Sequence, residues 1–116
     1  MLLYPIEMMS QKIDAKIVDQ LTKRIIAEIH PLRIILFGSY ARGDIHSDSD
    51  IDLFVIMPNG THRRQTAQKL YLNITDIDVP FDVIVGTPDD LEKYGSNPSL
   101  IYKSIEKEGI EIYAEW

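Results

Sequence analysis

Cysteine is absent from this chain of 116 residues, which excludes a disulfide framework and any zinc site built on thiolates. No apolar run approaches the length needed to span a membrane. The opening segment MLLYPIEMM is too short, and too interrupted by Pro5 and Glu7, for a signal peptide. The hydrophobic fraction of 45% and the charged fraction of 26% are ordinary for globular proteins. We therefore expect a soluble cytoplasmic protein that does not associate with membranes.

Basic residues are fewer than acidic ones: the chain has 12 Lys and Arg and 18 Asp and Glu, which gives a net charge of −6. A protein whose main task is binding a nucleic-acid backbone needs a basic surface, so we expect no direct nucleic-acid partner. The acidic balance still allows a nucleotide ligand, since carboxylates can bind a triphosphate through divalent cations.

Internal repeats, low-complexity segments and linkers are also missing, so residues 1–116 are expected to form a single domain. Strands are expected at four apolar runs, at residues 33–37, 50–57, 81–85 and 110–113. Helices are expected at residues 10–29, at residues 61–74, from Thr87–Pro88 onward, and from Asn97–Pro98 to Gly109. This alternation predicts one compact domain of the mixed α/β class.

The stretch GSYARGDIHSDSDID, residues 38–52, leads an acidic segment into an apolar strand. Asp50 and Asp52 are two positions apart, so on a strand their carboxylates project from the same face. Two like charges this close resist joint ionisation. A divalent cation would resolve the conflict, and an oxygen-only pair favours Mg²⁺ or Mn²⁺ over zinc. A solvated strand edge or an Asx-turn explains the pair about as well. Asp76 and Asp78 repeat the spacing in a predicted loop, where we do not expect metal binding.

Gly38 and Ser39 follow the strand expected at residues 33–37, where a short helical turn at residues 40–42 is expected to begin. Glycine lets the backbone approach a ligand closely, and amides at a helix N-terminus suit a phosphate group. The Ser39 hydroxyl and the Arg42 guanidinium would supply further donors. Taken alone, the Gly-Ser pair is better explained by a plain turn, and the Gly-Lys-Ser/Thr ending of a Walker loop is missing.

Asp82 adds a third carboxylate inside the predicted strand FDVIV, whose other four residues are apolar. An isolated aspartate in a core strand requires a partner. If this strand neighbours the strand at residues 50–57, Asp82 faces Asp50 and Asp52. Three carboxylates from two adjacent strands, beside a Gly-Ser phosphate site, are the pattern of two-metal phosphoryl transfer.

This combination resembles the nucleotidyltransferase signature of the DNA polymerase beta superfamily: Gly38-Ser39, ten intervening residues, Asp50-x-Asp52, and a later apolar-flanked Asp82. The short length and the form GSYARGD…SDSDIDL are most similar to the minimal nucleotidyltransferases, the MntA-type antitoxins. The ending IYKSIEKEGIEIY is also typical of that group. The resemblance implies the polymerase-beta-type nucleotidyltransferase fold, a mixed sheet flanked by helices.

The resemblance also implies a function, which is the ATP-dependent transfer of AMP to a hydroxyl group. It implies a HEPN-domain ribonuclease toxin as partner, so the predicted activity is an antitoxin-type protein adenylyltransferase that inactivates the toxin by modifying a tyrosine. The residues to which it assigns two Mg²⁺ ions (or Mn²⁺) and catalysis are Asp50, Asp52 and Asp82. Of these, Asp82 would be the general base. The residues that it assigns to the phosphates of ATP are Gly38 and Ser39, with Arg42 as a helper.

Two other functions remain open. One is an antitoxin that neutralises its partner by binding alone, with an idle nucleotide site. The other is a small-molecule nucleotidyltransferase of the aminoglycoside-modifying type, working as an oligomer. After three strands and their helices little sequence is left for an acceptor-binding domain, which favours a protein acceptor. A complete carboxylate set favours chemistry over binding alone, since an unused acidic cluster would only destabilise the fold.

Overall fold

The computed structural model describes residues 12–94, 105 and 107–115. Its elements are, in chain order, α1 (Lys12–Ile29), β1 (Arg33–Phe37), α2 (Ser39–Arg42), β2 (Ile51–Ile56), α3 (Arg63–Asn73), β3 (Phe81–Gly86), α4 (Pro88–Tyr94) and β4 (Ile110–Ala114). All four predicted strands are therefore present. The predicted helix start at Asn97–Pro98 lies outside the described residues, although Ile105 is helical and its carbonyl accepts a hydrogen bond from the Gly109 N–H at 2.9 Å. None of the described helices is long and apolar enough to cross a bilayer.

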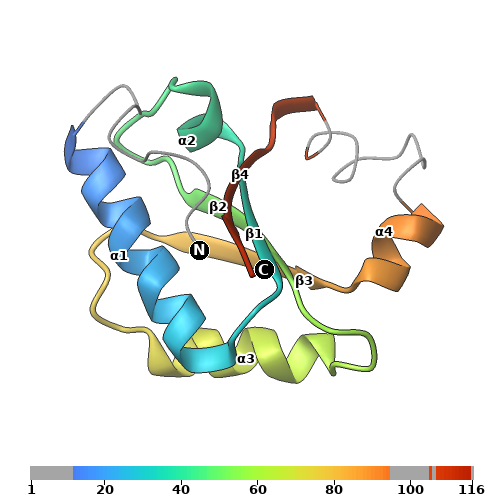
Figure 1. Cartoon of the computed structure of the whole chain (residues 1–116). Helices are drawn as coiled ribbons and strands as arrows, with labels where there is room; N and C mark the ends of the chain where they lie inside the picture. Colours follow the sequence, from blue (N-terminus) through green and yellow to red (C-terminus); the bar gives the residue numbers. More distant parts are fainter. Residues whose placement is uncertain (1–11, 95–104, 106, 116) are drawn as a thin grey trace.

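The strands form a mixed sheet in the order β3-β2-β1-β4 (Figure 1). β1 is antiparallel to both β2 and β4, whereas β2 and β3 are parallel. Parallel neighbours need a crossover connection, and α3 lies in the chain between β2 and β3. The mixed sheet flanked by helices that the family resemblance implies is confirmed.

The sheet buries different side chains on its two faces because successive residues of a strand alternate in direction. One face packs against α1 and α3, and its core includes Val18, Leu21, Ile34, Leu53 and Leu70. The opposite face carries a second cluster of buried residues, namely Ile35, Phe37, Phe54, Ile56 and Ile105, with Leu91 of α4 packed against it. Strand alternation places the even-numbered residues of β2 and β3, including Asp52 and Asp82, on this second face. We call it the carboxylate face.

Local sequence signals explain where the helices begin and end. In α1, Leu21 and Ile25 are fully buried one turn apart, and the helix ends before His30, which has a φ of 50° and precedes Pro31. At the start of α4, the Thr87 N–H donates to the Asp90 carboxylate at 3.0 Å, and the Asp90 N–H donates to the Thr87 hydroxyl at 3.3 Å. These reciprocal bonds form a capping box, which confirms the helix start predicted at Thr87–Pro88.

Candidate functional site

The parallel pairing of β2 and β3 brings together two of the predicted carboxylates. Asp52 lies directly opposite Asp82 in the register, and neighbouring strands are about 4.8 Å apart. Asp50 immediately precedes β2 and is half-buried, as is Asp52. The strand at residues 81–85 does neighbour the strand at residues 50–57, which is the condition under which the sequence places Asp82 near this pair.

Asp82 differs from the sequence prediction in its burial. The sequence suggests an aspartate in a core strand, but Asp82 is exposed. The reason is that β3 is an edge strand of the sheet formed by the described residues, so solvent reaches its outer side. Burial therefore does not oblige Asp82 to have a partner, and its proximity to Asp52 comes from the strand register instead.

Gly38 lies in direct contact with the Asp52 carboxylate. A Cβ atom added to Gly38 would stand 2.3 Å from the Asp52 Oδ2 atom, and the φ of Gly38 is +75°. Glycine is needed here for both reasons, because side chains are rarely tolerated at positive φ and this one would overlap Asp52. The Gly38 carbonyl accepts hydrogen bonds from the Ala41 and Arg42 N–H groups, both at 3.1 Å, which start the short helix α2. The predicted strand-to-helix turn is confirmed, with Ser39 as the first residue of α2.

Arg42 ends α2 and is exposed, with two acidic partners. Its Nη1 donates to Glu108 at 2.9 Å and its Nε to Asp44 at 3.3 Å. The hydrogen bonds to Glu108 and Asp44 raise the pKa of the guanidinium above its ordinary value. Glu108 comes from the segment before β4, 66 positions away. No local pattern in the sequence indicates Glu108, and its place in the ending IEKEGIEIY was the one available signal.

The Asp52 carboxylate is held in an environment that disfavours its charge. Burial raises its pKa most, and the negative charges of Asp82 and Asp50 raise it further, while Arg42 lowers it. Asp50, Asp82 and Arg42 therefore all act electrostatically on Asp52. The mutual repulsion of three carboxylates is the condition that a divalent cation relieves.

The three carboxylates fit a hard divalent cation chemically, since all their donor atoms are oxygens. Within residues 12–94, 105 and 107–115, no three acidic or histidine side chains are grouped closely enough to hold a metal ion by themselves. Mg²⁺ is usually bound by only one or two carboxylates together with waters and substrate phosphates. A pair of carboxylates such as Asp50 and Asp52 is the number that a protein commonly contributes to such a site.

The family model described as a nucleotidyltransferase domain matches residues 15–112. The chain belongs to this family. The resemblance to the nucleotidyltransferases is thereby confirmed. This nucleotidyltransferase is also 28% identical, over 74 residues, to a protein of Methanocaldococcus jannaschii named "Putative protein adenylyltransferase MJ0141". That match covers 54% of this chain and 74% of the relative.

Solved structures share the fold of this nucleotidyltransferase. A "putative nucleotidyltransferase" from Sulfolobus solfataricus matches with a TM-score of 0.56 and 18% identity, over 85% of this chain and 78% of that one. A toxin–antitoxin structure with AMP-PNP matches with a TM-score of 0.52 and 23% identity, over 86% and 73%. A mutant of the toxin–antitoxin pair MntA-HpeT matches with a TM-score of 0.51 and 21% identity, over 88% and 73%.

The raised pKa of Asp52 predicts a pH-dependent stability of the metal-free nucleotidyltransferase. A carboxylate whose folded pKa lies above its unfolded value binds protons more tightly in the folded state, so ionising it costs stability as pH rises. Asp52→Asn removes this cost, and we expect the variant to be more stable at pH 7 by up to about 1 kcal/mol, since solvent screens a half-exposed group. The advantage should shrink as pH falls toward the ordinary aspartate value of 3.8.

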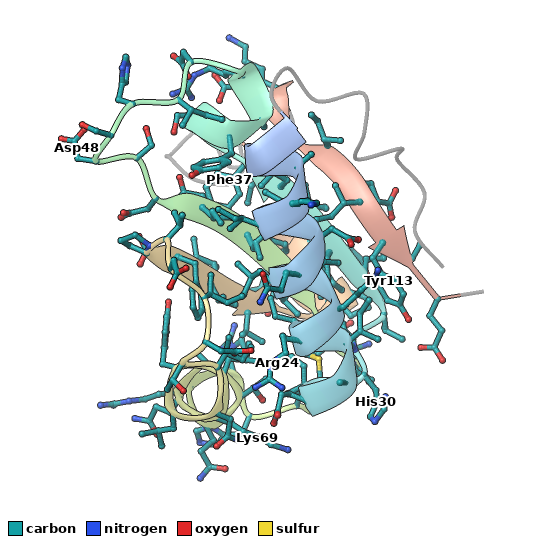
Figure 2. The ribbon with its side chains drawn as sticks, turned by 90° about the vertical axis from the view of Figure 1, so that its left-hand side faces the viewer. Arg24, His30, Phe37, Asp48, Lys69 and Tyr113 are labelled. Carbon is teal, nitrogen blue, oxygen red and sulfur yellow. The ribbon has the colours of Figure 1, made fainter. Side chains whose placement is uncertain are left out.

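Urea denaturation between pH 4 and pH 8, without metal, measures this dependence. Asp48→Asn is the matched control, because it changes the net charge equally at an exposed position of the loop before β2 (Figure 2). A gain in stability for Asp52→Asn that did not vary with pH would contradict the electrostatic explanation.

Proposed function

We propose that this nucleotidyltransferase transfers AMP from Mg·ATP to a tyrosine hydroxyl of a partner HEPN ribonuclease toxin, and so inactivates the toxin. The observation that carries the proposal is the meeting of Asp52 with Asp82 across two parallel strands, with Gly38 against the Asp52 carboxylate. A relative named as a protein adenylyltransferase supports the choice of reaction. The toxin–antitoxin structures of the same fold support the choice of partner.

In the proposed reaction, Gly38 and Ser39 bind the β and γ phosphates of ATP through the start of α2. Arg42 assists them at the end of the same helix. Asp50 and Asp52 would hold Mg²⁺, which when bound neutralises the charge of the phosphates. These residues fix the α-phosphorus in place for in-line attack.

Asp82 takes the proton from the attacking tyrosine hydroxyl. The tyrosine oxygen then forms a bond to the α-phosphorus while the bond to the bridging oxygen of pyrophosphate breaks, so that AMP is left on the toxin. The exposure of Asp82 supports a protein acceptor, because an edge strand leaves room for a segment of another chain to bring its hydroxyl to the carboxylate. Attack needs that oxygen roughly 3–3.5 Å from the phosphorus.

The test is incubation of the protein with Mg²⁺, ATP and the toxin encoded beside it. We expect the intact mass of the toxin to increase by one or more AMP units, with ribonuclease activity falling in parallel. Peptide mapping should place the modification on a tyrosine. Loss of ribonuclease activity without any mass change would favour neutralisation by binding. Transfer of AMP to an aminoglycoside, with none to the toxin, would favour the small-molecule alternative.

A further inference from the structure

We infer that Tyr71 of α3 is a positioning residue for Asp82, an inference that rests on the proposed function of Asp82 as the general base. Tyr71 contacts the residues on both sides of Asp82 in β3, namely Phe81 and Val83. Its residue surface is 44% exposed, so packing in the core does not by itself account for a large aromatic residue at this position.

The first contact is a hydrogen bond at the open edge of the sheet. The Pro80 and Gly86 carbonyls accept bonds from β2 and the residue after it, at 2.9 and 2.8 Å, so the even-numbered residues of this strand direct their backbone polar groups toward β2. The odd-numbered residues direct theirs to the other side. The Val83 N–H therefore points outward, and there it donates to the Tyr71 hydroxyl at 2.8 Å.

The second contact is aromatic. The rings of Tyr71 and Phe81 stack with centroids 5.5 Å apart and an angle of 17° between their planes. Such pairs contribute about 0.5–1.5 kcal/mol beyond the area they bury. Together the two contacts hold β3 immediately before and immediately after Asp82.

The helix that carries Tyr71 is itself firmly placed. Leu70, the neighbouring residue, is fully buried in the core, and the Lys69 ammonium donates to the Glu28 carbonyl of α1 at 3.1 Å. In Figure 2, α3 is seen along its axis next to β3, while β4, which carries Tyr113, lies at the opposite edge of the sheet. Within the described sheet, β3 is hydrogen-bonded to a neighbouring strand on one side only. Tyr71 links its other side to the helix α3.

The position of a general base matters because small displacements of a reacting group can reduce the rate by about a hundredfold. An edge strand is held by fewer backbone hydrogen bonds than a central strand. Without Tyr71, the backbone of Asp82 would depend on β2 alone. The nucleotide would be unaffected, since Gly38, Ser39 and the Asp50–Asp52 pair lie on other elements.

The test compares Tyr71→Phe with Tyr113→Phe. The first variant keeps the stacked ring but removes the hydrogen-bond acceptor, and the second removes a hydroxyl from β4 at the opposite edge. For Tyr71→Phe we expect the Val83 amide proton to exchange about tenfold faster, as measured by NMR. We expect kcat for AMP transfer to fall roughly tenfold, with the KM for ATP unchanged. Tyr113→Phe should change none of these quantities.

The measurements separate this inference from the proposed function. Faster exchange of the Val83 amide with an unchanged kcat would overturn the positioning role, as would an unchanged exchange rate. An increase in the KM for ATP that accounts for the whole loss would also overturn it, by placing the effect on the nucleotide. If the wild-type protein transfers no AMP, the proposed function fails, and the exchange of the Val83 amide alone decides whether Tyr71 holds this strand.

Discussion

Replacing Asp50 and Asp52 by asparagine is expected to lower the rate of AMP transfer by on the order of a thousandfold or more. The charges of Asp50 and Asp82 both raise the pKa of Asp52, and the Asp50–Asp52 pair is the protein's proposed share of the Mg²⁺ site. Asparagine keeps the size of each side chain but removes both charges, so the phosphates of ATP would lose their neutralising cation. The measurements are the intact mass of the toxin and the Mg·ATP-dependent rise in melting temperature, which should disappear.

Asp76→Asn with Asp78→Asn is the matched control for this double variant. It changes the same residue type at the same spacing and alters the net charge equally, in the loop before β3. The control variant loses the exposed ion pair between Asp76 and Arg24, at 3.4 Å. This loss should lower the free energy of unfolding by at most about 1 kcal/mol. AMP transfer should be retained. If the Asp50 and Asp52 double variant neutralised the toxin as well as the wild type without nucleotide, the protein would act by binding, and the proposed transfer reaction would be wrong.

Gly38→Ala is expected to abolish the stabilisation by Mg·ATP and to reduce AMP transfer by about a hundredfold. The added Cβ would overlap the Asp52 Oδ2 atom at 2.3 Å, so Asp52 or the start of α2 must move. Alanine would also be strained at a φ of +75°, at a cost of about 1–3 kcal/mol. The change therefore disturbs the predicted phosphate site and one carboxylate together.

Gly60→Ala separates these two effects. Gly60 has a similar φ of +90°, but a Cβ added there would meet nothing within 4 Å. We expect this variant to show the cost of backbone strain in urea denaturation while keeping its response to Mg·ATP. Equal losses of nucleotide-dependent stabilisation in the two alanine variants would show that Gly38 matters for its backbone conformation alone, and not for its contact with Asp52.

The local features of this protein could be predicted from the sequence because the signals that define them are themselves local. The spacing of apolar residues in α1 and the Thr87–Pro88 start of α4 depend on neighbours within a few positions. The same holds for the chemistry of residues 38–52, where glycine, serine and paired aspartates occur within one short segment. The family could be recognised for this reason.

Only the tertiary structure decided how the distant parts meet. The apolar run at residues 81–85 predicts a strand, but it does not show which strand lies beside it or whether it is at an edge. Because β3 lies at an edge, Asp82 is exposed. Its apolar neighbours in the sequence wrongly suggest that it is buried. The parallel register with β2 places Asp82 opposite Asp52.

Two side chains could not be connected with the site from the sequence, because their contacts join residues that are distant in the chain. Glu108 meets Arg42 across 66 positions, and Tyr71 meets Val83 across 12. The sequence predicts a helix at residues 61–74, which does not indicate what the Tyr71 hydroxyl contacts. The sequence alone determined the residues that can carry phosphate and metal chemistry. The pairing of β2 with β3, which depends on contacts far apart in the chain, decided how those residues are brought together.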